Sequence, residues 1–302
     1  MIPVEYSFQR YLEAKKSIDD RALNGDVWRT MASRLPPSSR ERPLRVLEVG
    51  AGTGTMLERM LDRDLFSYAV YTAVDALEEN GVHARQSLGQ WATGRGLRFS
   101  GTADRWAMMG KESQIEICYL QEDFFDFAAV EKEKWDVLIA SAFLDLTDIP
   151  STLPLLFKML DSGGIFYFAI NFDGATILEP RIDGDELIMA LYHRSMDERT
   201  INGRRSGDSR AGRHLFSMLK ECGAQILAAG GSDWAVFAGA DGYPGDEAYF
   251  LHYIVNDIRH AIIKSEIDTS LLDQWIAERH KQIENGELVY IAHQLDFTGI
   301  AR

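Results

Sequence analysis

Cysteine is scarce in this sequence, and its scarcity excludes several kinds of site. The 302 residues contain 2 cysteines, Cys118 and Cys222, and they have neither CxxC nor metal-ligand spacing. This usage argues against a disulfide framework and against a cysteine-based metal centre, and we expect no metal site. It predicts two reduced, buried thiols in a reducing compartment.

Positive charge is also in short supply. The chain has 32 Lys and Arg residues against 46 Asp and Glu residues, which gives a formal net charge of -14 and a pI near 5.0. Nucleic-acid binding usually depends on clustered cations that neutralise phosphates, and an anionic lipid surface repels an acidic protein for the same reason. We therefore expect neither nucleic acid nor membrane as a partner, and favour a small molecule or a protein.

Long apolar runs are missing. No stretch approaches the roughly 20 apolar residues that a membrane span needs. The start, "MIPVEYSFQRYLEAKKSIDD", has no apolar core of signal-peptide length, so we expect a cytoplasmic protein. Repeats and low-complexity tracts are absent too, and a composition that is 46% hydrophobic and 26% charged is typical of a globular protein. Nothing in the sequence indicates the oligomeric state.

Apolar residues recur at helical spacing over residues 8–33, and the linker "LPPSSRERP" follows. Strand-like runs rich in Val, Ile and aromatic residues then alternate with helical segments. The expected strands are 44–50, 71–76, 114–123, 135–142 and 163–172, and the expected helices are 54–63, 78–92 and 151–160. This alternation predicts parallel strands with right-handed crossovers, and hence a doubly wound, mostly parallel α/β sheet.

The remainder of the chain is less regular. A polar, arginine-rich stretch at 192–213 precedes an expected helix at 209–221, a pair of strands and a helical block. We expect the segments 174–208 and 245–284 to be helical insertions that cap the ligand crevice. The predicted organisation is an N-terminal helical lid, 1–43, and one α/β domain, 44–302.

The stretch "RVLEVGAGTGTM" has glycines at positions 50, 52 and 54 directly after a predicted strand. Such a turn can approach NAD, FAD or S-adenosylmethionine closely, because glycine has no Cβ. A dinucleotide fingerprint places its third glycine where this chain has Thr55. Moreover, Glu48 would repel a pyrophosphate but suits a ligand that carries an ammonium and a sulfonium.

This E-x-G-x-G-x-G pattern resembles motif I of the class I S-adenosylmethionine-dependent methyltransferases. "YTAVDA", "LQEDFFDF", "WDVLIASAFLDLTD" and "MLDSGGIFYF" resemble later motifs in the order of that family, over residues 44–173. The resemblance implies a seven-stranded sheet and S-adenosylmethionine as cofactor. It implies that Asp75 accepts the ribose hydroxyls and that Asp123 and the backbone of Phe124 meet the adenine. The implied cofactor residues are Glu48, Gly50, Ala51, Gly52, Gly54, Asp75, Asp123, Phe124 and Ser141.

The residues that bind the methyl acceptor are harder to predict. Positions at the carboxyl edge of the sheet and in the expected cap give the substrate candidates Asp145, Asn171, Tyr192 and Arg205. His193, Tyr192 and Asp173 are the candidates for a catalytic role. His193 also fits a structural role, and the arginines Arg204, Arg205, Arg210 and Arg213 also fit a solvated loop.

We therefore predict in-line methyl transfer to a small molecule, an anionic one if an arginine clamps it. Two alternatives remain open at this stage. One is an NAD-dependent oxidoreductase, which Thr55 and Glu48 disfavour. The other is an interaction protein that binds the cofactor without turnover, because a fold and a cofactor site do not establish chemistry.

Overall fold

The structure is a computed structural model that describes residues 2–301. Its centre is a ten-stranded sheet with the order β10-β12-β7-β6-β1-β2-β5-β4-β3, and β11 pairs with β12. The strands are β1 (Leu44–Val49), β2 (Tyr68–Asp75), β3 (Arg98–Gly101), β4 (Arg105–Met109), β5 (Gln114–Gln121), β6 (Trp135–Ser141), β7 (Leu160–Glu179), β10 (Gln225–Gly231), β11 (Trp234–Val236) and β12 (Val289–Ile300). The hairpin β8 (Thr200–Ile201) and β9 (Arg204–Arg205) is separate.

The strand directions confirm the predicted fold class. β5, β2, β1, β6 and β7 are parallel, whereas β12 runs antiparallel between β7 and β10. The order reverses between β1 and β6, and in doubly wound sheets the ligand crevice lies at this switch point. Seven strands form the predicted sheet, and the hairpin of β3 and β4, which we did not predict, extends its edge.

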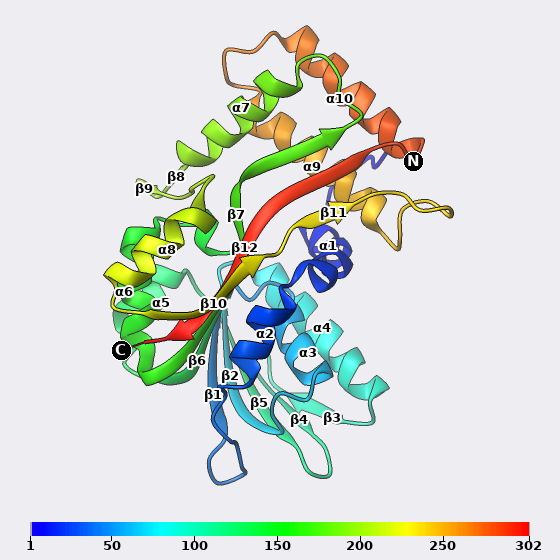
Figure 1. Ribbon diagram of the computed structural model, residues 1–302. Coiled ribbons are helices and arrows are strands. Elements are labelled where there is room, and N and C mark those ends of the chain that lie inside the picture. The colour runs from blue at the N-terminus through cyan, green and yellow to red at the C-terminus, as the bar shows by residue number, and fades with distance from the viewer. Residues whose placement is uncertain (1, 302) are drawn as a thin grey trace.

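Helices cover both faces of the sheet (Figure 1). The helices are α1 (Phe8–Ala22), α2 (Gly25–Ala32), α3 (Thr55–Asp62), α4 (Glu78–Gly94), α5 (Phe124–Val130), α6 (Ile149–Met159), α7 (Asp185–Asp197), α8 (Ala211–Glu221), α9 (Glu247–Ile262) and α10 (Thr269–Glu284), with a short 3-10 turn at Leu144–Leu146. α2, α3 and α4 pack in one apolar cluster, and α5, α6 and α8 pack in a second on the opposite face. Residues buried between these layers form the core.

An upper lobe stands on the extended ends of β7 and β12, which continue beyond the sheet as a ribbon that carries α7, α9 and α10, and β11 pairs with part of this extension of β12 (Figure 1). β7 bends at Ile170, whose φ of 56° is rare for a β-branched residue. The carboxylate of Asp296 on β12 accepts the Ile170 N–H at 2.7 Å and the Asn24 N–H at 2.8 Å. This buried acid therefore joins the bend to the turn between α1 and α2.

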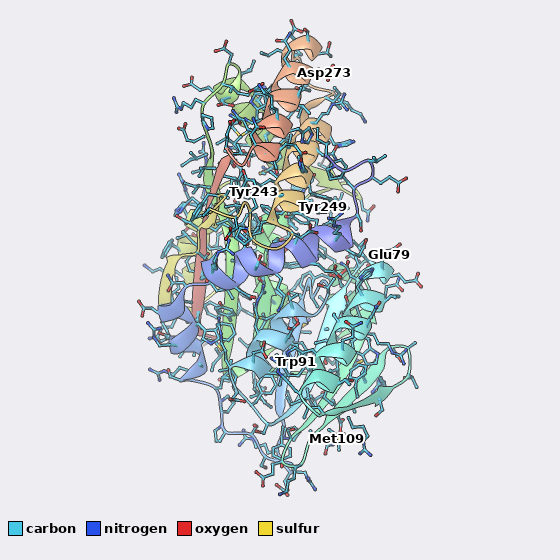
Figure 2. The ribbon with its side chains drawn as sticks, turned by 90° about the vertical axis from the view of Figure 1, so that its right-hand side faces the viewer. Glu79, Trp91, Met109, Tyr243, Tyr249 and Asp273 are labelled. Carbon is cyan, nitrogen blue, oxygen red and sulfur yellow. The ribbon has the colours of Figure 1, made fainter. Side chains whose placement is uncertain are left out.

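α1 crosses between the two halves of the molecule. Seen from the side, Met109 of β4 and Asp273 of α10 lie toward opposite ends, and α1 passes between them (Figure 2). Its N-cap is Ser7, whose hydroxyl accepts the Arg10 N–H. This position lets one face of α1 contact both the lobe and the glycine turn.

Three expectations need correction. The polar stretch expected at 192–213 begins within a helix, since Tyr192 and His193 lie in the last turns of α7. β7 is longer than the expected 163–172, since the ribbon that it forms with β12 continues it to Glu179. Cys118, in β5, and Cys222, at the end of α8, are free but only half-buried rather than buried. Among residues 2–301, no helix combines the length and hydropathy needed to cross a bilayer.

Candidate functional site

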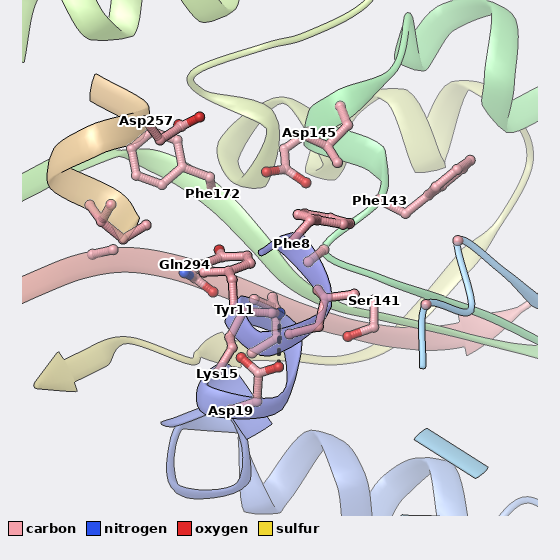
Figure 3. Close-up of a pocket in the computed structure, with 18 of the residues that line it drawn as sticks. Phe8, Tyr11, Lys15, Asp19, Ser141, Phe143, Asp145, Phe172, Asp257 and Gln294 are labelled. Atoms are coloured by element: carbon pink, nitrogen blue, oxygen red, sulfur yellow. Dashed lines mark hydrogen bonds and ion pairs between the residues drawn. The ribbon is translucent and has the colours of Figure 1, made fainter. Parts of the chain in front are cut away.

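A cavity of about 910 Å³ lies at the switch point of the sheet, between the carboxyl ends of β1, β2 and β6 and the lobe. Its wall includes the turn after β1, the ends of β2 and β6, the bend of β7 and the facing sides of α1, α7 and α9. Figure 3 shows side chains from these segments directed into one space. The cavity thus joins the sheet edge, where cofactors bind in such folds, to a wall built by the added helices.

The turn after β1 is shaped by two glycines. Gly50 and Gly52 have φ angles of 65° and 52°, which side-chain-bearing residues seldom adopt. A Cβ at position 50 would lie 2.6 Å from Cδ2 of Phe143. The Gly52 N–H donates to Asp75 Oδ2 at 2.8 Å, and its carbonyl accepts the Tyr119 hydroxyl at 2.7 Å. The backbone itself is therefore the surface that a ligand meets here.

Asp75, at the end of β2, organises this region. Its Oδ1 accepts the Leu77 N–H and the Asn80 amide N–H, both at 3.0 Å. Asn80 is 2% exposed, and its Oδ1 has no hydrogen-bond partner among the described residues. A buried acceptor without a donor is costly, so this oxygen suits a ligand that donates a hydrogen bond.

Glu48 lies at the end of β1 and is fully enclosed. Its Oε2 accepts the Tyr71 hydroxyl at 2.6 Å. Burial outweighs this hydrogen bond and raises the pKa of Glu48 to about 8. The carboxyl is therefore largely protonated at neutral pH, and a positive charge beside it would favour the ionised form.

The wall opposite the glycine turn contains two further acids. Asp145, just after β6, has a buried Oδ1 without a partner within residues 2–301, and burial raises its pKa to about 6. Asp257 of α9 accepts the Tyr192 hydroxyl at 3.2 Å, and burial raises its pKa as well. Gln294 of β12 is 2% exposed and directs another unpartnered oxygen, Oε1, to the same space.

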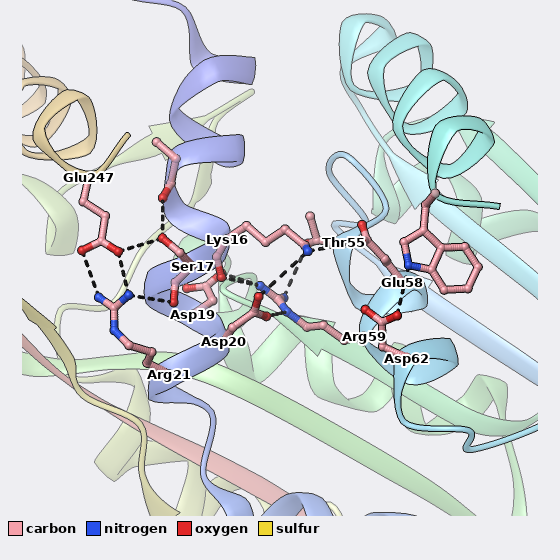
Figure 4. A network of polar contacts seen from close by, with 12 residues as sticks. Lys16, Ser17, Asp19, Asp20, Arg21, Thr55, Glu58, Arg59, Asp62 and Glu247 are labelled. Atoms are coloured by element: carbon pink, nitrogen blue, oxygen red, sulfur yellow. Dashed lines mark hydrogen bonds and ion pairs between the residues drawn. The ribbon is translucent and has the colours of Figure 1, made fainter. Parts of the chain in front are cut away.

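Ion pairs hold α1 against the glycine-turn side of the cavity (Figure 4). Arg59 of α3 is 5% exposed and contacts Asp20 at 2.5 Å and Asp19 at 3.5 Å. Asp19 also accepts the Lys15 ammonium at 2.9 Å and the Trp234 indole N–H at 2.8 Å. These contacts fix the cavity-facing side of α1 next to the helix that begins at the glycine turn.

A second connection ties α1 to the lobe. Glu247 of α9 is fully buried and receives both terminal nitrogens of Arg21, at 2.6 and 2.9 Å. The Ser17 hydroxyl donates to the same carboxylate at 2.8 Å (Figure 4). α1 is therefore bound to both sides of the cavity that it covers.

The structure brings many of the predicted residues to this cavity. Its wall contains the predicted cofactor residues Glu48, Gly50, Ala51, Gly52, Asp75 and Ser141 and the predicted substrate residues Asp145 and Tyr192. Most come from the turn and strand ends around the switch point. Residues that directly follow a buried parallel strand in the sequence therefore lie at the carboxyl edge of the sheet, where the cavity is.

Three predicted cofactor residues lie outside the wall that the described residues form. Gly54 is the N-cap of α3 and packs near Leu88. Asp123 is exposed and caps α5, accepting the Phe125 N–H at 2.8 Å. Phe124 is buried at the start of α5, with its ring against that of Phe143. The first two are placed by helix capping and the third by packing.

The other predicted residues have structural partners elsewhere. Asp173 binds the Arg213 side chain at 2.8 Å. His193 pairs with the Thr176 hydroxyl at 3.0 Å, and burial lowers its pKa. Asn171 is fully buried and donates to the carbonyls of Phe168 and Leu295 in the sheet. Arg205 is exposed on β9, beside a second, smaller cavity.

Several cavity residues escaped the sequence analysis. They are distant in sequence and carry no motif: Phe8, Tyr11, Lys15, Asp19, Asn80, Phe172, Arg199, Tyr253, Asp257 and Gln294. For Lys15 and Asp19 a signal existed, because they form an i,i+4 pair on the otherwise apolar side of a predicted helix. For Asp257 and Gln294 no local pattern indicates the cavity.

The comparisons with known proteins concern the fold. No protein-family model matches the chain, and no curated protein is similar enough in sequence to match it. Among solved structures, the chain is similar to a cyclopropane-fatty-acyl-phospholipid synthase-like protein from Lactobacillus casei, with 12% sequence identity, 97% of this chain and 92% of that chain covered, and a TM-score of 0.50.

Two further structures are similar to the chain at lower scores. One is a protein from Bacillus halodurans provisionally described as a methyltransferase, with 13% identity, 91% of this chain and 99% of that chain covered, and a TM-score of 0.49. The other is geranyl diphosphate C-methyltransferase from Streptomyces coelicolor, with 8% identity, coverages of 91% and 79%, and a TM-score of 0.45.

The likeness to the Lactobacillus casei protein agrees with the strand order and with the position of the cavity. The fold is that of the class I methyltransferases. The resemblance found in the sequence motifs is thereby confirmed at the level of fold. At such low identity the class I methyltransferase fold is all that the comparison establishes, and the activity must be argued from the site.

Proposed function

We propose that the chain is an S-adenosylmethionine-dependent methyltransferase that acts on a small molecule. The observation that carries this proposal is the turn at Gly50 and Gly52, whose positive φ angles present bare backbone to a cavity at the switch point. The motif that produces this turn is the one that resembles the methyltransferase family. Fold, turn and cavity therefore support the same cofactor.

The residues around the turn fit S-adenosylmethionine. Without a Cβ at positions 50 and 52, the backbone can approach the methionine part of the cofactor. Asp75 would accept the ribose hydroxyls, and the unpartnered Oδ1 of Asn80 offers a further acceptor beside it. Ser141, at the end of β6, would complete this side of the site.

Glu48 favours this cofactor over a dinucleotide. Its buried carboxyl has a pKa raised to about 8, so its ionised form gains from a nearby cation. The ammonium and sulfonium of S-adenosylmethionine supply positive charge, whereas the pyrophosphate of NAD would add repulsion. We therefore rank the oxidoreductase alternative lower.

The cofactor supplies an activated methyl group, and the protein has to position the acceptor and exclude water. Phe8 and Tyr11 of α1 cover the cavity, and we infer that residues 1–43 act as its lid. The segments 174–208 and 245–284, which carry α7, α9 and α10, would form the rest of the cap. Burial raises the pKa of Tyr192 well above its usual value, so this phenol would donate a hydrogen bond rather than act as a base.

The cavity also supports a small-molecule acceptor. Cavities that hold small molecules measure roughly 300–1,000 Å³. The arginines that suggested an anionic acceptor do not support one here, because Arg205 is exposed and Arg213 is paired with Asp173. The proposal includes a reducing, cytoplasmic location, which two free cysteines support.

Isothermal titration calorimetry with S-adenosylhomocysteine and, separately, with NADH tests the proposal. We expect a dissociation constant on the order of micromolar for S-adenosylhomocysteine and no measurable heat with NADH. Tight binding of NADH, or no response to S-adenosylhomocysteine, would contradict it. Binding of S-adenosylmethionine without methyl transfer to any amine, phenol or carboxylate in an acceptor screen would favour the interaction-protein alternative.

A further inference from the structure

The charge lining the cavity is unbalanced. Seven carboxyl side chains contribute to its wall: Asp19, Glu48, Asp75, Asp145, Glu198, Asp208 and Asp257. Three cationic side chains do so: Lys15, Arg59 and Arg199. Lys15 and Arg59 are already paired with acids of α1. The part of the cavity facing the lobe is therefore left with an excess of carboxyl groups.

Asp145 and Asp257 lie in this part without a cationic partner. Within residues 2–301, neither makes an ion pair within 4.0 Å. Asp145 has a buried oxygen that accepts no hydrogen bond in the described structure, and the hydroxyl of Tyr192 is the group that donates to Asp257. Both carboxyl groups line the cavity, and neither is neutralised by a cationic partner (Figure 3).

Arg199 is the cation that could have balanced these acids. Its Nε donates to the carbonyl of Ser206, which draws the guanidinium toward the loop before α8. It lowers the pKa of both Asp145 and Asp257 from a distance, as Lys15 does for Asp145 and His260 for Asp257, yet burial dominates and both pKa values remain raised. One unpaired guanidinium cannot compensate two carboxylates, so the subsite retains negative charge when both ionise.

Aromatic side chains surround the same space. Phe172 and Tyr192 are each 8% exposed, and Tyr253 stacks on Tyr11 with ring centroids 4.3 Å apart. All four line the cavity. Aromatic faces attract cations, and acids among aromatic rings are a recurring way to bind substituted ammonium groups.

We propose that the methyl acceptor carries an ammonium group, which Asp145 and Asp257 hold against the rings of Phe172, Tyr192 and Tyr253. The inference rests on the proposed function and names the chemical class of its substrate as a small organic amine. It concerns the charge that is recognised rather than the atom that is methylated. A carboxylate or phosphate at this position would face two acids and is disfavoured.

The test uses probes of one shape and different charge. Phenethylamine, phenethyl alcohol and phenylacetate, and likewise hexylamine, hexanol and hexanoate, are titrated calorimetrically into protein saturated with S-adenosylhomocysteine. We expect each amine to bind at least about tenfold more tightly than its alcohol, and the carboxylates to bind most weakly. Amines that bind no better than the matched alcohols and acids would overturn the inference.

Substitutions test whether Asp145 and Asp257 are the residues that recognise the amine. Asp145→Asn and Asp257→Asn keep the shape of each side chain, and each should remove most of the preference for the amine. Asp273→Asn makes the same charge change on an exposed residue of α10 and should leave the preference intact. Thermal melting of each variant shows whether it is folded, and the probe series on the unmodified chain does not depend on the variants.

The same titrations separate this inference from the function on which it rests. Failure of the unmodified chain to bind S-adenosylhomocysteine would overturn the proposed function. Normal cofactor binding without a preference for amines would overturn the inference alone. Loss of S-adenosylhomocysteine affinity in Asp145→Asn, with the amine preference unchanged, would assign Asp145 to the cofactor and also overturn it.

Discussion

The two walls of the cavity are built differently. The wall after β1 is largely backbone, where Gly50, Ala51 and Gly52 follow one path fixed by hydrogen bonds to Asp75 and Tyr119. The wall beneath the lobe consists of side chains from α1, α7 and α9. A backbone wall depends on φ angles and close approach, so few sequences produce it. A side-chain wall can change residue by residue while the fold stays the same, which suits the part of an enzyme that selects its substrate.

We expect the largest loss of cofactor affinity when a glycine of the backbone wall is replaced by a residue with a branched side chain. Gly52→Val places a β-branched residue at a φ of 52° and disturbs the N–H bound to Asp75. We expect affinity for S-adenosylhomocysteine to fall by at least about 100-fold, since such strain costs roughly 1–3 kcal/mol and lost contacts add to it. Calorimetry measures the loss.

A matched control separates strain from instability. Gly163 also has a positive φ, 75°, but lies in open space at the start of β7, away from the cavity. Gly163→Val should therefore cost stability while leaving the affinity for S-adenosylhomocysteine unchanged. Equal affinities in the two variants would mean that the turn at Gly52 does not contact the cofactor.

Two acids that follow or end strands, Asp75 and Asp123, test how far the cofactor site extends from the glycine turn. Asp75 lines the cavity, whereas Asp123 is exposed and caps α5. Asp75→Ala should lower affinity for S-adenosylhomocysteine by about tenfold or more, because several hydrogen bonds are lost. Asp123→Ala should change affinity less than about twofold and cost about 1 kcal/mol of stability through the lost cap. The reverse order of affinities would place the adenine against Asp123, as the sequence motif predicts.

Glu48 should make the affinity for the cofactor depend on pH. Because its pKa is raised to about 8, a cationic ligand must displace a proton from it at lower pH. Affinity for S-adenosylmethionine should therefore fall as pH drops below about 8, by up to roughly tenfold per unit. Calorimetry in buffers of different ionisation enthalpy would measure proton release near pH 7, and Glu48→Gln should abolish it. Binding without proton release would show that the ligand charge lies away from Glu48.

The smallest effect concerns α1, which joins the two walls. Arg21→Gln leaves Glu247 buried without its cation, and we expect a loss of about 1–3 kcal/mol in the free energy of unfolding. Arg29→Gln removes an exposed pair with Asp26 and should cost less than about 0.5 kcal/mol. Urea denaturation compares the two variants, and equal losses would mean that the contact between α1 and α9 does not hold the lid.

The sequence analysis succeeded where local physics determines structure. The run from β1 to α3 could be predicted because a buried strand, a positive-φ turn and a helix start must follow one another within a few residues. Glu48 and Thr55 then favoured one cofactor over another. The β3–β4 hairpin was missed because its strands have only four and five residues and β3, at the sheet edge, is largely exposed, so the hydrophobic alternation is too short to stand out.

The side-chain wall beneath the lobe could not have been predicted in the same way. Tyr11, Asp257 and Gln294 are far apart in sequence, and the bend of β7 and the ribbon with β12 bring them to one cavity. Asp123 shows a different difficulty. The motif predicts that its carboxylate binds the adenine, and in the structure the same carboxylate accepts the Phe125 N–H and caps α5. Capping and ligand binding use the same residue types, so spacing alone does not distinguish them.

The most direct test asks where the cofactor binds. Hydrogen–deuterium exchange would be followed by mass spectrometry with and without saturating S-adenosylhomocysteine. We predict slower exchange in the peptides covering residues 49–56 and 75–80, with little change in the β3–β4 hairpin. Unchanged exchange at 49–56 under saturating ligand, with protection confined to other segments, would contradict the account.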